Sequence, residues 1–298
     1  MAITATGRAI GALRHTAEGL ADRLPPLLVA AERVAATVAQ GVHGRRRVGV
    51  GETFWQFRPY QPGDSSARID WRQSARGAQL YLRDQEWEAA ESVWLWADTS
   101  SSMAYGSRPG LPTKEDRATL LMLALASLLV RGGERIALLG DSRRPVGGRA
   151  GMTAFCESVA TRPEPGPSLP PVQRLPRHAR VVLISDFFTP ADELRTRFRS
   201  YLGLGVRGHL VQVLDPAEPA LPYAGRVRFE GVELEGDALI ANVDGVRQVY
   251  QRRLEAHLLA LRELARSVGW TLATHTTDHP AEPPLLALYT ALGTRGQG

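Results

Sequence analysis

The sequence predicts an α/β protein in which helices flank a doubly wound, mainly parallel sheet, preceded by an N-terminal helical and small β extension. From about residue 91, short apolar stretches alternate with longer helical ones, which is the order of parallel crossover units. Hydrophobic residues make up 44% of the 298 residues and charged residues 22%, enough apolar material for a large core. Aromatic residues and turn signals between residues 48 and 90 indicate a small β or irregular region.

The N-terminal part, residues 1–40, is predicted to form two amphipathic helices. Apolar residues recur there at steps of three and four, with a break at Pro25 and Pro26. We expect these stripes to pack on the rest of the protein; a docking surface for a partner helix is the alternative. The expected organisation is N-terminal helices in 1–40, a small arginine-rich β or irregular subdomain in 41–90, and the α/β domain in 91–298.

The elements of the α/β domain follow from apolar runs and from their lengths. The most apolar run, 118–130, is shorter than the ~20 residues needed to span a bilayer, so we interpret it as part of a core helix. Strands are expected at 92–97, 135–140, 179–185, 208–214 and 270–275, with a hairpin in 226–240. Helices are expected at 114–131, 153–160, 190–202, 243–267 and 283–291.

The net charge of +5 is local rather than global. The chain has 36 basic and 31 acidic residues, and the stretch 41–83 holds eight arginines against three acids. The rest of the chain is therefore balanced. A basic surplus raises the possibility of a nucleic-acid partner, but no recognised nucleic-acid motif accompanies the arginines, so the sequence argues against that reading.

Cysteine usage and the N-terminus indicate a cytoplasmic protein. Cys156 is the only cysteine, which excludes an internal disulfide and a multi-thiolate zinc site. The N-terminal residues lack the uninterrupted apolar region of a signal peptide. No membrane span is expected.

Polar residues follow two of the expected strands directly. Asp98, Ser100 and Ser102 form a D-x-S-x-S spacing after the strand at 92–97, and Asp186 follows the strand at 179–185. Ligands of doubly wound sheets gather beyond the carboxyl ends of the strands, so these side chains are candidates for a common site. Hard oxygen donors in such a site suit Mg²⁺ or Mn²⁺. Ordinary turn capping by Asp98, with no metal, is the alternative.

This arrangement, together with a hydroxyl at Thr153 before a helix, resembles the metal-ion-dependent adhesion site of von Willebrand factor A domains. The resemblance implies a von Willebrand A-like fold and a bound Mg²⁺ or Mn²⁺. It implies a metal shell completed by an acidic side chain of a partner protein. The metal-site residues it implies are Asp98, Ser100, Ser102, Thr153 and Asp186.

The segment before the sheet carries a second, more specific resemblance. The strings R-P-Y-Q-P-G-D at 58–64, R-I-D-W at 68–71 and S-A-R at 74–76 occur in order, ahead of Glu86, Glu88 and the Asp98 motif. They resemble a bacterial family of von Willebrand A-like proteins of unknown function (domain of unknown function fifty-eight), usually encoded beside MoxR-type AAA+ ATPases. One departure is Ser65, where the family commonly repeats the aspartate. The family-motif residues are Arg58, Tyr60, Gly63, Asp64, Arg68, Asp70, Trp71 and Arg76.

The same motif residues also have a structural interpretation. Pro62 and Gly63 suit a tight turn, and Trp71 can fill a core. The motif arginines can pair with neighbouring carboxylates, namely Asp64, Asp70, Glu86 or Glu88. An arginine-lined partner surface is the functional alternative, and the sequence leaves both open.

The resulting expectation is a non-enzymatic, divalent-metal-dependent protein-binding adaptor that works with a MoxR-type AAA+ ATPase on an unidentified client protein. No catalytic residue is assigned. The first alternative is a metal-dependent hydrolase that uses Asp98 and Asp186 around Mg²⁺. Against it, the sequence contains no H-E-x-x-H string and no phosphate-binding glycine loop, and the seven histidines are scattered. The second alternative is nucleic-acid binding through the arginines of 41–83.

Overall fold

The computed structural model describes residues 28–39, 54–59, 71–77, 79–85, 92–163, 165–202, 205–229 and 238–293. The chain divides into two compact units. One unit comprises Arg46–Ala90, and the other comprises Met1–Arg45 together with Glu91–Gly298. The first of the two predicted N-terminal helices lies outside the described residues, and the helical segment 28–39 belongs to the larger unit.

The small unit contains a two-stranded antiparallel sheet. Strand β1 (Phe54–Pro59) pairs with β2 (Tyr81–Gln85), and the register shifts between Phe54 and Gln56. A short helix, α2 (Trp71–Ser74), lies between them in the sequence. The Ser74 hydroxyl accepts a hydrogen bond of 2.9 Å from the backbone N–H of Tyr81, which ties the helix to the start of β2. A β region of this kind is what the aromatic residues and turn signals predict.

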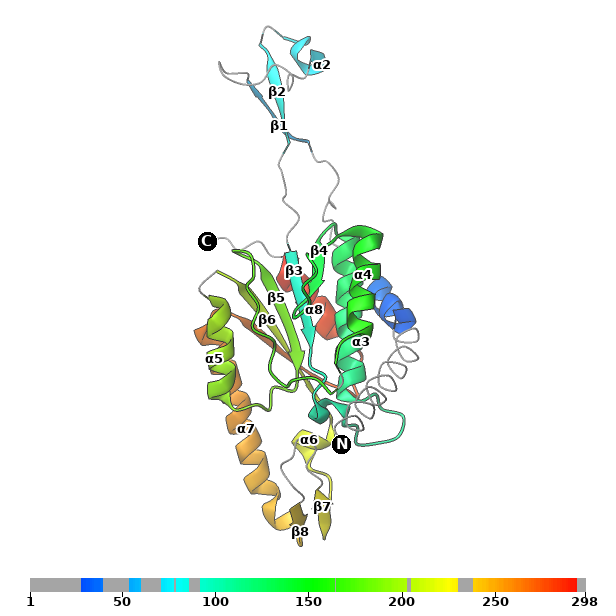
Figure 1. Ribbon diagram of the computed structural model, residues 1–298, viewed down its shortest axis with the longest axis vertical. Helices are drawn as coiled ribbons and strands as arrows, with labels where there is room; N and C mark the ends of the chain where they lie inside the picture. Colours follow the sequence, from blue (N-terminus) through cyan, green and yellow to red (C-terminus); the bar gives the residue numbers. More distant parts are fainter. Residues whose placement is uncertain are drawn as a thin grey trace, which may run out of the picture. The chain divides into compact units, whose positions relative to one another are not determined.

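The large unit is built on a five-stranded sheet whose strands are all parallel, in the order β4-β3-β5-β6-β9. The fold is therefore α/β with a parallel sheet flanked by helices, as the sequence predicts, and it is consistent with a von Willebrand A-like arrangement (Figure 1). The strands are β3 (Ser92–Ala97), β4 (Arg135–Leu138), β5 (Arg180–Ser185), β6 (Arg207–Leu214) and β9 (Thr271–Thr276).

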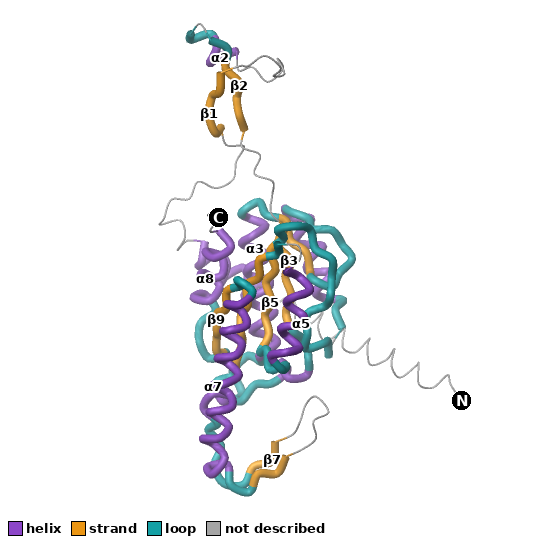
Figure 2. The backbone as a smooth tube through the Cα atoms, turned by 90° about the vertical axis from the view of Figure 1, so that its left-hand side faces the viewer, coloured by secondary structure: helices purple, strands orange, loops and turns teal. Residues whose placement is uncertain are grey.

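Two hydrophobic cores cover the two faces of this sheet, because successive side chains of a strand point to opposite faces. In β3, Val93 and Leu95 belong to one core, whereas Trp94 and Trp96 belong to the other. The first core contains α3 (Lys114–Arg131), α4 (Gly148–Ala160) and α8 (Glu282–Gly293), and the second contains α5 (Ala191–Leu202) and α7 (Val243–Ser267). Figure 2 shows α5 and α7 on the near side of the strands and α3 and α8 behind them.

The helical segment 28–39 packs into the first core. Ala31, Ala35 and Val38 are buried there at steps of three and four, as expected for an amphipathic helix. The Ser127 hydroxyl of α3 donates a 2.7 Å hydrogen bond to the Glu32 carboxylate. This segment is therefore part of the sheet unit.

Some elements differ from the prediction. Helix α4 begins at Gly148 rather than at residue 153, because the chain first returns along β4 through an antiparallel bridge between Val146 and Ile136. Its first turn is glycine-rich and carries no apolar pattern that marks a helix. A 3₁₀ turn, η2 (Ser101–Ala104), and a four-residue helix, α6 (Ala217–Ala220), are additional. The predicted hairpin is present as β7 (Val227–Phe229) and β8 (Ala238–Ile240).

No helix in the described part of the chain is both long and apolar enough to cross a membrane.

Candidate functional site

The carboxyl ends of β3 and β5 form the topological switch point of the sheet. These two strands are neighbours, and the chain moves from β3 to β4 on one side and from β5 to β6 on the other. Asp98 and Asp186 directly follow the two strands, and the backbone N–H of Asp98 donates a 2.9 Å hydrogen bond to the carbonyl of Ile184. Switch points of this kind are where doubly wound sheets bind ligands.

Asp98 is fully buried and each of its carboxylate oxygens accepts a hydrogen bond. One oxygen accepts from the backbone N–H of Ser100 at 2.8 Å, and the other accepts from the hydroxyl of Ser185 at 2.6 Å. Burial disfavours the charged form and raises the pKa of Asp98 to about 6, although both hydrogen bonds oppose the shift. The nearby charge of Asp186 raises it further. Asp98 therefore anchors the loop that carries the two serines.

Ser100 and Ser102 present two hydroxyls beside the second aspartate. Their hydroxyl oxygens are 3.2 Å apart, and the Ser102 hydroxyl donates a 2.9 Å hydrogen bond to Asp186 Oδ2. Ser100 and Asp186 are buried, whereas Ser102 is half-buried. The 3₁₀ turn that begins at Ser101 produces this arrangement, because it folds the loop back toward the end of β5. A ligand that approaches from solvent meets the Ser102 side first.

A buried lysine completes the cluster. Lys114 is 1% exposed, and its ammonium lies 2.8 Å from Asp186 Oδ2 and 2.5 Å from Glu218 Oε1. The ring centroids of Phe188 and Tyr105 lie 5.1 Å and 6.0 Å from the same nitrogen. Burial alone lowers the pKa of Lys114, but the charges of the two carboxylates outweigh burial and raise it above its ordinary value. The residue is therefore held as a cation.

Helix α3 fixes the position of Lys114. The side chain of Thr113 caps the helix by accepting a hydrogen bond of 3.1 Å from the backbone N–H of Asp116. Lys114 is thus the first helical residue, at the end of α3 that lies beside the carboxyl edge of the sheet. The cap fixes where the helix starts, and therefore fixes the backbone position from which the Lys114 side chain extends to the cluster.

Glu218 comes from α6, which follows β6. The backbone N–H of Asp215 donates a 2.8 Å hydrogen bond to the Glu218 carboxylate, and Asp215 in turn accepts from the backbone N–H groups of Ser107 and Ala217. Burial raises the pKa of Glu218 even though Lys114 lowers it. Of the two carboxylates, Asp186 does more than Glu218 to raise the pKa of Lys114, so we take Asp186 as the stronger counter-ion of Lys114.

We call Asp98, Ser100, Ser102, Lys114, Asp186 and Glu218 the carboxyl-edge cluster. Four of its members are predicted from the sequence. Lys114 and Glu218 are not. One signal for Lys114 is available, because it is the only lysine in the chain.

Glycine allows a second loop to lie close against the cluster loop. The backbone N–H of Gly166 donates a 2.9 Å hydrogen bond to the carbonyl of Thr99, and the Thr99 hydroxyl donates to the carbonyl of Pro163 at 3.1 Å. A Cβ at position 166 would lie 2.2 Å from the Thr99 hydroxyl oxygen. Only glycine fits this approach without a shift of the loop.

The structure does not bring Thr153 to the cluster. Thr153 lies within α4, is exposed, and donates a 3.1 Å hydrogen bond to the carbonyl of Arg149 one turn earlier. Because α4 starts at Gly148, Thr153 is a residue of the helix interior instead of the loop that precedes it. None of its described contacts reaches the serines or the aspartates.

The oxygen atoms of the cluster suit a hard divalent cation as ligands, although the ammonium of Lys114 already contacts one of them. Two oxygens about 3 Å apart can be neighbouring ligands of one Mg²⁺, because bonds of 2.0–2.1 Å at right angles separate them by about 2.9 Å. The hydroxyls of Ser100 and Ser102 meet this requirement. Among the described residues, no group of three or more His, Cys, Asp or Glu side chains is placed to hold a metal ion, so a cation here needs the serines as ligands. The ammonium of Lys114 already contacts Asp186.

Two histidines of the described residues, His257 and His209, form hydrogen bonds outside the cluster. His257 Nε2 lies 2.7 Å from the carbonyl of Phe187, next to Asp186, and therefore supports the loop after β5. His209 is buried in β6 with its Nδ1 2.8 Å from the Thr271 hydroxyl. Within the described part of the chain, neither imidazole pairs with a serine hydroxyl of the cluster.

The family-motif residues fall largely outside the described residues. Tyr60, Gly63, Asp64, Arg68 and Asp70 lie there, as do Glu86 and Glu88.

The motif residues inside the described part belong to the small unit. Arg58 is in β1, opposite Leu82. Arg76 is exposed, and so is Trp71, with 66% of its surface accessible. The interpretation of Trp71 as a core residue is therefore wrong, because α2 is a single turn that leaves the indole uncovered within the described part.

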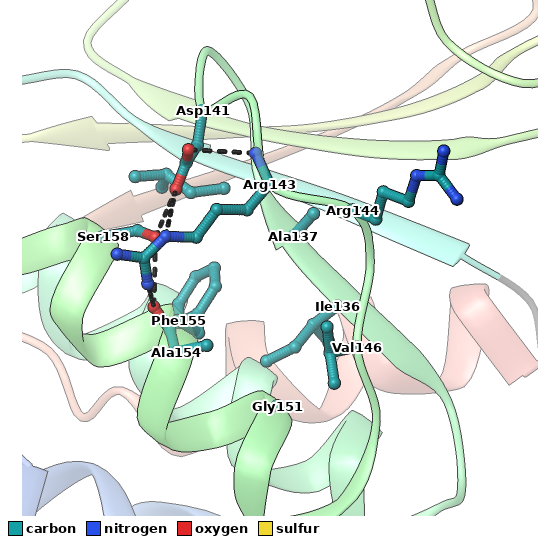
Figure 3. Close-up of a pocket in the computed structure, with 11 residues that line it drawn as sticks. Ile136, Ala137, Asp141, Arg143, Arg144, Val146, Gly151, Ala154, Phe155 and Ser158 are labelled. Atoms are coloured by element: carbon teal, nitrogen blue, oxygen red, sulfur yellow. Dashed lines mark hydrogen bonds and ion pairs between the residues drawn. The ribbon is translucent and has the colours of Figure 1, made fainter.

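A separate hollow lies between β4 and α4, with a volume of about 290 Å³ (Figure 3). Its floor is apolar and includes Ile136 and Phe155. Arg143 donates to the carboxylate of Glu157 at 3.0 Å and lies 3.7 Å from that of Asp141, so its charge is balanced within the wall. The lining of this hollow has one hydroxyl and one carboxylate, Ser158 and Asp141, which are hydrogen-bonded to each other, whereas the carboxyl-edge cluster has two hydroxyls, several carboxylates and a buried lysine.

The sequence of this chain matches the model of one protein family. The family model described as "Protein of unknown function DUF58" matches residues 56–259. An uncharacterized protein of Mycobacterium tuberculosis and one of Mycobacterium bovis are each 27% identical over 277 residues, which cover 87% of this chain and 85% of theirs.

Two solved structures are similar at lower identity. The conserved hypothetical protein BatB from Bacteroides thetaiotaomicron is 12% identical with a TM-score of 0.32, and the match covers 68% of this chain and 97% of that one. An aerotolerance-related membrane protein from Bacteroides fragilis is 16% identical with a TM-score of 0.37, and the match covers 67% of this chain and 98% of that one.

Proposed function

This chain belongs to the DUF58 family of proteins of unknown function, and from that membership and the geometry of its site we propose that it is a non-enzymatic protein-binding adaptor. Its carboxyl-edge cluster would recognise a carboxylate of a partner protein through a divalent cation, Mg²⁺ or Mn²⁺. One observation carries the proposal: two serine hydroxyls 3.2 Å apart lie at the switch point of the sheet, beside a buried aspartate.

The residues of the cluster have different roles in the proposed metal binding. Asp98 orients the loop by accepting from Ser100 N–H, and Ser100 and Ser102 supply the hydroxyl ligands. Asp186, which accepts a hydrogen bond from the Ser102 hydroxyl, supplies negative charge. A bound cation would supply the positive charge that attracts a partner Asp or Glu.

The contacts of the cluster favour binding over hydrolysis. A hydrolase of this type needs a nucleophile or a positioned base in addition to a metal. The Ser185 hydroxyl donates to Asp98 and accepts from the backbone N–H of Phe187, so both of its roles are structural. The imidazole of His257 lies within hydrogen-bond distance of the backbone carbonyl of Phe187.

As part of the same proposal, the partner is a MoxR-type AAA+ ATPase that acts with this adaptor in the assembly, maturation or remodelling of a client protein. The family resemblance supports this choice, and the site chemistry fits an acidic side chain on either partner.

The test is co-purification of the full chain with a MoxR-type AAA+ ATPase from the same organism, in Mg²⁺ and in chelator. The double variant Ser100→Ala with Ser102→Ala removes both hydroxyl ligands and should lose the partner while staying folded. Asp98→Ala should do the same. Ser107→Ala is the matched control, because Ser107 lies on the same loop and only its backbone N–H contacts Asp215. Partner capture that is unchanged in chelator, or in the double variant, would overturn the mechanism.

A further inference from the structure

The ammonium of Lys114 occupies a position built for a cation. Two carboxylates, Asp186 and Glu218, contact it at 2.8 Å and 2.5 Å, and the rings of Phe188 and Tyr105 lie within 6.0 Å. Aromatic faces and carboxylates both attract positive charge. The surroundings of this nitrogen are therefore those of a bound cation, and here the cation is a side chain of the protein itself.

The ammonium and a metal ion would need the same oxygen. Asp186 Oδ2 accepts from the Lys114 ammonium at 2.8 Å and from the Ser102 hydroxyl at 2.9 Å. A divalent cation held by Ser102 and Asp186 would thus lie beside a fixed positive charge in a buried setting. Repulsion between like charges is strong where water is scarce.

From this shared oxygen we propose that Lys114 is a tethered cation that competes with the divalent metal ion for the carboxyl-edge cluster. The proposal rests on the function proposed above, since it concerns the affinity of that site. Lys114 keeps the carboxylates neutralised in the absence of metal, and metal binds only when it displaces the ammonium from Asp186. Glu218 is the carboxylate that retains the lysine after displacement.

Lys114 has little freedom to leave the cluster altogether. Thr113 caps α3 and fixes the first helical residue, and the Glu218 carboxylate is held in turn by the backbone N–H of Asp215 at 2.8 Å. The competition is therefore between Asp186 and Glu218 as partners of one ammonium. The expected result is a weak metal site whose affinity the lysine sets.

The experiment is a titration of the full chain with Mn²⁺, followed by electron paramagnetic resonance of the free ion. Lys114→Met removes the charge but keeps the length of the side chain, and should bind Mn²⁺ at least tenfold more tightly than the wild type. Lys114→Arg keeps the charge and should bind no more tightly than the wild type. The gain should vanish when Ser100→Ala and Ser102→Ala are added to Lys114→Met, which places the ion at the cluster.

Lys114→Met leaves a buried carboxylate, Asp186, and a half-buried one, Glu218, without their counter-ion, and this could unfold the variant. A second variant therefore tests the same proposal. Lys114→Met with Glu218→Gln removes one carboxylate as well as the ammonium, and should also bind Mn²⁺ more tightly than the wild type. Circular dichroism checks that each variant is folded.

Equal or weaker Mn²⁺ binding by folded Lys114→Met and by folded Lys114→Met with Glu218→Gln overturns the competition, and so does a gain that survives loss of both serines. Failure of the adaptor function has a different signature. In that case Lys114→Met gains Mn²⁺ affinity, yet the wild type captures no ATPase in Mg²⁺. Conversely, metal-dependent capture of the ATPase with no effect of Lys114 on Mn²⁺ affinity refutes the competition alone.

Discussion

Replacement of Asp98 by asparagine is expected to stabilise the metal-free protein at neutral and alkaline pH. The substitution removes a buried charge and keeps the shape of the side chain. The asparagine carbonyl can still accept from Ser100 N–H, and its amide can donate to the Ser185 hydroxyl oxygen, which now accepts one hydrogen bond from Phe187 N–H. The Ser185 hydroxyl proton, however, loses the carboxylate as its acceptor. This loss lowers the absolute advantage of the variant, but it does not supply the change of that advantage with pH.

The magnitude follows from the pKa of Asp98. Burial raises that pKa from 3.8 to about 6, roughly two units, and each unit corresponds to 1.36 kcal/mol. The folded state holds the proton more tightly than the unfolded state, so the wild type loses stability as pH rises from about 4 to 6. Above pH 6 the full cost is present, on the order of 3 kcal/mol. Near pH 4.5 about 1 kcal/mol of it remains.

The assay is urea-induced unfolding of the wild type and Asp98→Asn in chelator at about pH 4.5 and about pH 8. Each unfolding free energy comes from linear extrapolation. The advantage of the variant should grow by about 2 kcal/mol between the two conditions. Buried histidines also titrate in this range, but they are common to both proteins, so their contribution cancels in the difference.

Two results would refute the reasoning. An advantage that is the same at both pH values would mean that Asp98 does not titrate between them. A variant less stable than the wild type near pH 8 would mean that the hydrogen bonds of the carboxylate outweigh the cost of burying its charge.

The remaining predictions concern packing and acid stability. Gly208→Ala should destabilise the fold by about 3 kcal/mol or more, because the new Cβ would lie 2.0 Å from the Trp270 ring, and a thermal melt measures the loss. Gly245→Ala, within α7, is its control: the nearest side-chain atom to the new Cβ is that of Asn242, 3.7 Å away, so the variant should gain about 0.5–1 kcal/mol of stability. Burial lowers the pKa of His209 and His275 to about 4, so the unfolded chain binds more protons and stability should fall as pH drops from 6.5 to 4. His209→Gln should reduce that acid loss in urea unfolding, and an unchanged pH profile would contradict this.

The elements that the sequence predicts best are those with both periodicity and caps. Helices α3 and α7 have the predicted bounds, Lys114–Arg131 and Val243–Ser267. Thr113 and Asn242 cap them, and both caps are readable in the sequence. Strand β3 likewise has its predicted bounds. By contrast, β4 ends at Leu138, two residues early, because Gly140 has a φ of 97° and turns the chain.

The candidate site likewise contains residues that the sequence predicts and residues that it does not. Asp98 and Asp186 can be placed together from the sequence, because each directly follows an apolar strand and parallel strands end at one edge. Ser100 and Ser102 follow from their spacing after Asp98. Lys114 is at a helix start, where the sequence gives its position along the chain but not the direction of its side chain.

Glu218 and Thr153 illustrate what pattern reasoning lacks. Glu218 is on α6, a helix of four residues that is too short to have a period. The sequence predicts Thr153 at the start of a helix, 153–160, whereas α4 begins at Gly148, directly after the bridge of Val146 to Ile136, and encloses Thr153. In both cases a tertiary contact decides the position.

The long sequence separation of the cluster's contacts has a consequence for folding. Ser102 and Asp186 are 84 positions apart, and Lys114 and Glu218 are 104 apart. Loops of this length close late and slowly, because their entropy is lost before the contact is gained. The binding surface therefore forms only when β3, β5 and β6 are all in register. A nascent or partly unfolded chain has no such surface, so under the proposed function only the fully folded molecule would capture a partner.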